Sequence, residues 1–182
     1  MTKPKPFLAT AIGSFPYDNA SKALDLIFET IPEAPLWPQL PKLGLNEQME
    51  IQYSEGMPCV VYDKEKGRMF FQTDGDYSEE FGSFYETYMT AMDPTDGTGD
   101  CSAMAISPEF SMGIVAFEDR LKSIGGKRPF VKVHTTGPCT VCLAVVDENK
   151  RAIYYNEEFR DVITKALAMK CRWQIQIGRA HV

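Results

Sequence analysis

The sequence lacks the features that would assign it to several special classes of protein. Its 182 residues contain no internal repeat and no low-complexity stretch. No apolar run approaches the roughly 20 residues that a transmembrane helix needs. Positive charge is not in excess either, since 19 Lys and Arg stand against 25 Asp and Glu, for a net charge of -6. An acidic surface repels phosphate backbones, so we expect neither a nucleic-acid partner nor a membrane partner.

Histidine and paired cysteine are also scarce. The chain has two histidines, and its five cysteines are odd in number and irregular in spacing. This pattern argues against a disulfide framework and favours the reducing cytoplasm. Cys139 and Cys142 form a C-x-x-C, but no second pair completes a zinc site and no thioredoxin-like pattern surrounds them. We therefore interpret them as small buried residues.

The residues that are present describe an ordinary globular chain in which strand-like and helix-like segments alternate. Hydrophobic residues make up 44% of the chain and charged residues 24%. Short apolar runs predict strands at 7–12, 34–37, 103–106 and 130–134, and a hairpin is expected at 59–73. Repeated strand-then-helix order implies a parallel sheet with crossover helices. Composition alone leaves two options open, a small doubly wound sheet and half of an eight-fold barrel.

Two glycine-containing turns follow predicted strands with the same layout. Gly13-Ser14 comes after the first strand, and Thr136-Gly137 comes after the fourth, next to His134. A glycine lets backbone N–H groups approach a ligand closely, and a helix N-terminus nearby suits a carboxylate or phosphate. The alternatives are a plain turn with a capping serine and a histidine that has only a structural role.

Six segments occur in an order that is more specific than any one of them. They are TAIGSFP, PLWPQLP, YSEGMPCVVYD, AISPEFSMG, KVHTTGPCTVCLA and KALAMKCRWQIQ, and together they extend over Phe7 to Gln176. This combination resembles the superfamily of cobalamin-independent methionine synthase and uroporphyrinogen decarboxylase. The resemblance implies a (β/α)8 barrel of about twice this length. The expected fold is therefore α/β, a partial TIM barrel of about the first four β/α units with an inserted β-hairpin.

The resemblance also implies a function, the transfer of a methyl group to a thiol such as homocysteine. The methyl donor would be a folate or a methylated corrinoid protein. Zinc would belong to the full-length parent, with its ligands in the barrel's second half, so neither a metal site nor a catalytic residue is assigned here. The substrate-binding residues implied or expected are Ile12, Gly13, Ser14, Gln39, His134, Thr136 and Gly137.

Two other functions remain open at this point. A uroporphyrinogen decarboxylase-like enzyme would use arginines after the first helix, but residues 37–42 offer only Gln39 and Lys42. The other is an inactive truncated fragment. The last six residues, IGRAHV, match the translation of a widely used short-read sequencing adapter. We therefore expect residues 1–176 to be the native half-barrel and 177–182 to be non-native read-through.

Overall fold

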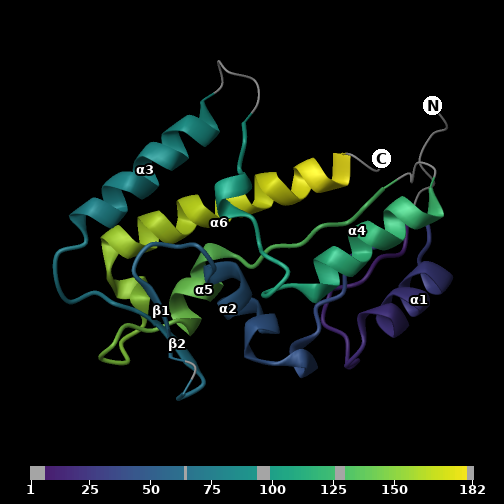
Figure 1. The fold of residues 1–182 in the computed structure, drawn as a ribbon, viewed down its shortest axis with the longest axis horizontal. Coiled ribbons are helices and arrows are strands. Elements are labelled where there is room, and N and C mark those ends of the chain that lie inside the picture. Colours follow the sequence, from purple (N-terminus) through teal and green to yellow (C-terminus); the bar gives the residue numbers. More distant parts are fainter. Residues whose placement is uncertain (1–6, 64, 94–98, 126–129, 180–182) are drawn as a thin grey trace. The chain divides into compact units, whose positions relative to one another are not determined.

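The computed structural model describes residues 7–63, 65–93, 99–125 and 130–179 (Figure 1). These residues form two compact units. Unit 1 comprises Met1–Gln48, Ser107–His134 and Gln174–Val182, and unit 2 comprises Met49–Ile106 and Thr135–Trp173. The long helix α6 (Glu157–Arg179) contributes residues to both.

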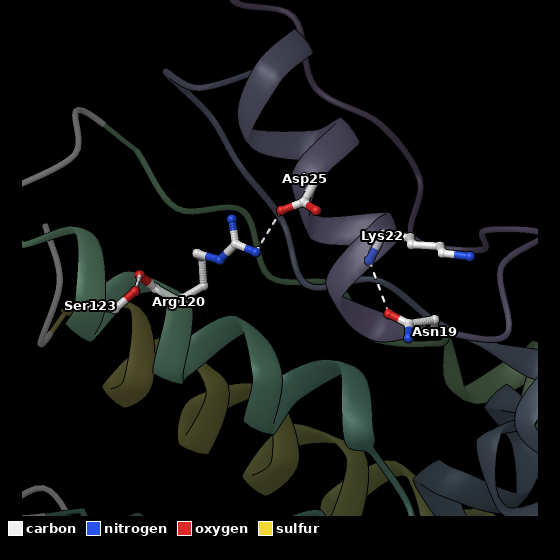
Figure 2. A network of polar contacts seen from close by, with 5 residues as sticks. All are labelled: Asn19, Lys22, Asp25, Arg120 and Ser123. Carbon is white, nitrogen blue, oxygen red and sulfur yellow. Dashed lines mark hydrogen bonds and ion pairs between the residues drawn. The ribbon is translucent and has the colours of Figure 1, made fainter.

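Unit 1 is built on two helices, α1 (Ala20–Thr30) and α4 (Met112–Ile124), with the short turns η1 (Pro41–Leu43) and η2 (Leu45–Glu47). Asp18 and Asn19 are both residue types that cap helices, and Asn19 is the one that caps α1, by accepting a hydrogen bond from the Lys22 amide (Figure 2). Gly125, the first residue of the pair Gly125-Gly126, ends α4 with a φ of 65°, which favours glycine, and Gly126 lies outside the described residues.

The two helices of unit 1 pack through an apolar stripe with an ion pair beside it. Phe28 of α1 and Phe117 of α4 lie with ring centroids 6.0 Å apart. An Arg120 guanidinium nitrogen lies 2.6 Å from an Asp25 carboxylate oxygen (Figure 2). The core residues that these helices bury are Ala23, Leu24, Ile27, Ile114, Phe117 and Leu121. Burial of this stripe is what positions the extended segments described below.

Unit 2 contains the predicted hairpin, which is confirmed. β1 (Val60–Asp63) pairs with β2 (Arg68–Phe71) in antiparallel register, with Val60 opposite Phe71. The helices and helical turns of this unit are α2 (Met49–Ser54), α3 (Ser78–Met92), η3 (Ser102–Met104), α5 (Pro138–Ala144), η4 (Ile153–Tyr155) and most of α6.

An aromatic cluster centred on Phe159 of α6 holds unit 2 together. The Phe159 side chain is fully buried, and Phe81 of α3 lies 4.9 Å from it between ring centroids. Phe71 of β2 and Tyr77 make edge-on contacts with the same ring. Aromatic pairs of this kind add about 0.5–1.5 kcal/mol each beyond the area that they bury.

The expected partial TIM barrel is wrong. The described part of the chain is 53% helical, and its only regular sheet is the two-stranded antiparallel hairpin. Residues 102–104 form a helical turn where a strand was expected. The expected strands near Ser14, Leu36 and Lys132 contribute only isolated parallel bridges, Ser14 with Gln39 and Leu36 with Lys132.

Proline explains why these bridges do not extend into a sheet. Pro35 and Pro38 flank the bridging segment, and neither residue has a backbone N–H to donate. A strand with prolines at these positions cannot continue a hydrogen-bonded ladder through the middle of a sheet. The apolar pattern of 34–40 was therefore a signal of burial, not of a strand.

Candidate functional site

Three extended segments of unit 1 bring several of the predicted site residues together. The Gln39 amide donates to the Gly13 carbonyl at 2.5 Å, and the Phe15 amide donates to the Gln39 carbonyl at 2.9 Å. The Lys132 amide donates to the Pro35 carbonyl at 2.9 Å. The turn after residue 12, the Pro-rich segment and the segment leading to His134 are thus joined by backbone hydrogen bonds.

Gly13 lies directly against the imidazole of His134. A Cβ atom at position 13 would overlap the Cε1 and Nε2 atoms of this ring, so no larger residue fits without a shift of His134. The imidazole stacks on Trp37, with ring centroids 3.8 Å apart and an interplanar angle of 22°. The buried Trp37 indole donates in turn to Gln174 Oε1 at 3.1 Å. The absence of a side chain at position 13 therefore permits this stack.

The charge state of His134 follows from its surroundings. Burial, together with the nearby Lys132 ammonium, lowers the pKa of His134 to about 4. The ring is consequently neutral at pH 7, and it offers one nitrogen donor and one nitrogen acceptor.

Ser14 is exposed, and the hydrogen bonds of its parallel bridge with Gln39 determine the direction of its backbone amide. The Gly13 carbonyl and the Phe15 amide face Gln39, so the intervening Ser14 amide faces the opposite side. No described residue forms a hydrogen bond with the Ser14 amide or hydroxyl. The backbone N–H and the hydroxyl of an exposed serine can both donate to a carboxylate.

Two charged residues of this region were not among the predicted site residues. The Lys132 side chain is partly buried, and its Nζ donates to the Ala11 carbonyl at 2.6 Å. Burial lowers the pKa of Lys132 from its ordinary value. Glu47 is only 4% exposed. Neither position carries a signal in the sequence, because what distinguishes each residue is its burial and its partners in the fold.

Glu47 links the Pro-rich segment to α4. Its Oε1 atom accepts the Met112 amide at 2.6 Å, and its backbone carbonyl accepts from Gln39 Nε2 at 3.1 Å. Burial raises the pKa of the Glu47 carboxyl, although the hydrogen bond from Met112 acts in the opposite direction. Its second oxygen is buried and has no hydrogen-bond partner among the described residues. Glu47 thus orients Gln39 and α4 at the same time.

The other predicted site residues lie in different surroundings. Ile12 is 82% exposed, so its side chain contributes little to a buried wall. Thr136 is buried and Gly137 is exposed, and both belong to unit 2, where Gly137 is the N-cap of α5. A Cβ at Gly137 would meet only Thr140 Oγ1, at 4.0 Å. The structure therefore joins Gly13, Ser14, Gln39 and His134 in unit 1.

The described residues do not fit a metal. No group of three or more histidine, cysteine or carboxylate side chains comes close enough to hold an ion within the described ranges. Within these ranges, no set of side chains is arranged to ligate a zinc ion. The expected zinc-containing TIM barrel of the methionine synthase type is therefore not supported: the described residues have neither that fold nor a metal-ligating group. Within the described residues, no helix has the length and apolar character required to cross a bilayer.

Comparison with protein-family models, with curated proteins and with solved structures finds no match to this chain. The resemblance inferred from the sequence therefore stays a prediction. The chemical character of the site rests on its own residues: a neutral imidazole stacked on an indole, an exposed serine turn and a partly buried lysine. Such a set can bind an anionic group and an adjacent flat or apolar one.

Proposed function

We propose that unit 1 binds the carboxylate end of a small amino-acid-like molecule at the Gly13–Ser14 turn. We further propose that the protein to which this chain belongs transfers a methyl group to the thiol of such a molecule, for example homocysteine. The observation that carries the binding proposal is the parallel bridge between Ser14 and Gln39, which turns the backbone amide of the exposed Ser14 away from Gln39.

The contacts of the turn support a carboxylate ligand. The Ser14 N–H and O–H would each donate to one carboxylate oxygen, and hydrogen bonds to a charged acceptor contribute about 1.5–3 kcal/mol each. The Lys132 ammonium, held through the Ala11 carbonyl, adds positive charge to the same segment. The stacked His134 and Trp37 rings would limit the ligand to a small body.

No described residue is assigned to the methyl-transfer step. The donor, a folate or a methylated corrinoid protein, is a proposal that rests on the resemblance alone. By itself the chain is proposed to bind and not to catalyse. Its five cysteines are free thiols, which supports a reducing compartment, and we propose the cytoplasm.

A decarboxylase is a second candidate, and Lys132 is the observation that favours it. Enzymes that release carbon dioxide need cationic groups near the substrate carboxylate, and Lys132 is a partly buried cation of the same segment as His134. In that case the bound carboxylate would be lost as product and not merely held.

Calorimetric titration distinguishes a carboxylate site from a generic pocket. We expect the chain to bind L-homocysteine at least tenfold more tightly than 3-aminopropane-1-thiol, the same molecule without its carboxylate. Ser14→Ala should weaken binding of L-homocysteine by about tenfold or more, because one of two donors is lost. Ser83→Ala, which changes an exposed serine of α3, is the matched control and should leave the affinity unchanged. Equal affinities for the two thiols would refute the proposal.

A further inference from the structure

Two thiols lie one helical turn apart in α5 and differ sharply in exposure. Cys142 is fully buried in unit 2, as expected for both cysteines, but Cys139 is exposed, so that expectation is wrong for Cys139. Three residues of α-helix separate two Cα atoms by about 5 Å. That distance falls inside the range of about 4.4–6.8 Å that a disulfide requires. The C-x-x-C therefore has one thiol within reach of solvent and a second within reach of the first.

The exposed thiol lines an open cavity in unit 2. This cavity has a volume of about 420 Å³, and its walls include Cys139, Tyr154, Arg160 and Thr164. The Arg160 guanidinium lies 5.3 Å from the centre of the Tyr154 ring, and its Nη1 donates to the Tyr154 carbonyl at 3.1 Å. Glu157 and Asp161 also line this cavity, and an Arg160 guanidinium nitrogen lies 3.9 Å from a Glu157 carboxylate oxygen. A small molecule that reaches Cys139 thus meets a polar wall with charges of both signs.

The remaining cysteines of the chain lack this arrangement. No cysteine stands three or four residues from Cys59, Cys101 or Cys171. Burial and the neighbouring Glu80 carboxylate raise the pKa of Cys59 to about 12, so that thiol is mostly protonated near neutral pH. Cys101 is fully buried. The combination of an exposed thiol and a nearby second thiol is specific to α5.

We propose that Cys139 and Cys142 form a reversible disulfide by exchange with a small, polar disulfide, such as glutathione disulfide. The Cys139 thiolate attacks one sulfur of glutathione disulfide, forming a mixed disulfide and releasing one glutathione thiolate. The Cys142 thiolate then attacks Cys139 Sγ, forming the internal disulfide and releasing the second glutathione thiolate. The two protons lost by the cysteines pass through solvent to the two glutathione thiolates, so two cysteines are oxidised as one glutathione disulfide is reduced.

The second step is the slow one. Burial raises the pKa of Cys142 to about 11, with a contribution from Cys139 and an opposing one from the Arg160 charge. Only the thiolate attacks, so the closing rate should rise about tenfold for each pH unit below that pKa. At pH 7 the mixed disulfide on Cys139 accumulates, whereas at pH 9 it is converted to the internal disulfide.

Mass spectrometry of the full 182-residue chain tests this proposal. The reduced chain is incubated with glutathione disulfide at pH 7 and pH 9, quenched with acid, alkylated and mapped by peptide. We expect a Cys139–Cys142 linkage that forms about 100-fold faster from the adduct at pH 9 than at pH 7 and that dithiothreitol reverses. A glutathione adduct on Cys139 that persists at pH 9 without the linkage would overturn the proposal, as would a Cys139 that stays reduced.

Three variants assign the steps. Cys142→Ser should trap the glutathione adduct on Cys139, and Cys139→Ser should abolish the linkage. Cys59→Ser is the matched control and should leave the rate of linkage unchanged. Because Cys142 is buried, its variant is first checked by circular dichroism. The wild-type peptide map decides the question by itself if that variant does not fold.

Discussion

Two glycine turns with the same layout in the sequence have different surroundings in the structure. Gly13 lies against the His134 imidazole in unit 1, where a Cβ would overlap the ring. Gly137 caps α5 in unit 2, and a Cβ there would meet no atom closer than 4.0 Å. Position 13 therefore requires glycine, whereas position 137 does not. A motif of a few residues gives the local backbone, but the neighbours that make it a site come from elsewhere in the chain.

The contact between Gly113 of α4 and Pro38 is where a single substitution should lower the free energy of unfolding most. A Cβ at Gly113 of α4 would overlap the Pro38 carbonyl oxygen and lie 3.0 Å from its carbon, and backbone cannot easily move. Gly113→Ala should therefore destabilise unit 1 by about 3 kcal/mol or more. Urea unfolding followed by Trp37 fluorescence, in a Trp173→Phe background, measures this. Gly82→Ala is the control, since position 82 of α3 has open space, and a change of similar size there would contradict the explanation.

The same substitution at the two turns tests the comparison directly. Gly13→Ala should cost about 2 kcal/mol, because the His134 ring must leave its stack on Trp37. Gly137→Ala should cost about 0.5 kcal/mol, the usual preference of an N-cap for glycine over alanine. A double-mutant cycle with His134→Ala should show a coupling of at least about 1 kcal/mol for Gly13 and none for Gly137. Equal costs at the two turns would remove the distinction between them.

Unit 2 should respond to pH through Lys170 of α6. This lysine is fully buried, its Nζ donates to the Met104 carbonyl at 3.2 Å, and burial lowers its pKa to about 8. The unfolded chain keeps the proton up to about pH 10.4, so the Lys170 contribution to the free energy of unfolding should rise as pH increases through about 8. Thiols exposed on unfolding ionise at about pH 8.5 and act in the opposite direction over the same range, because the folded-state pKa values of Cys59 and Cys142 are raised. The Lys170 contribution is therefore the difference between wild type and a variant without this lysine.

Replacement of this lysine isolates its contribution. Lys170→Met removes a buried ammonium at the cost of one hydrogen bond, so the variant should be about 1–2 kcal/mol more stable than wild type at pH 7. The advantage should shrink as pH rises to 9. Chemical unfolding followed by Trp173 fluorescence, in a Trp37→Phe background, gives both curves. Parallel curves would mean that Lys170 does not titrate in this range.

The ion pair between the helices of unit 1 should have the smallest effect. Arg120 and Asp25 form a short contact, but their side chains are 27% and 63% exposed (Figure 2). Asp25→Asn should therefore cost less than about 0.5 kcal/mol, and the cost should vanish in high salt. Lys22→Met changes a neighbouring exposed charge as a control. A loss above about 1.5 kcal/mol would show that the pair holds α1 on α4.

Local signals predicted the local structure well. The Asn19 cap, the hairpin of Val60 to Phe71 and the end of α4 at Gly125 all depend on residues that are close in sequence. The sheet was mispredicted because short apolar runs look alike whether or not their backbones pair. Pro35 and Pro38 remove the donors that a continuous ladder would need.

Only some residues of the candidate site could be predicted from the sequence. Gly13, Ser14, Gln39 and His134 were singled out, and the structure brings them together, while their role in binding stays a prediction. Glu47 and Lys132 were missed because their importance comes from burial and from partners many residues away. Neither burial nor such partners can be read from one sequence.

Binding of a carboxylate at the Ser14 turn is the central proposal for unit 1. The most direct measurement is a ¹H–¹⁵N correlation spectrum of the labelled chain during titration with L-homocysteine. We predict saturable shifts of the Ser14 amide and of the Gly13 amide, with the Gly137 amide unchanged. Shifts confined to Gly137 and its neighbours, or no saturable shift at Ser14, would contradict it.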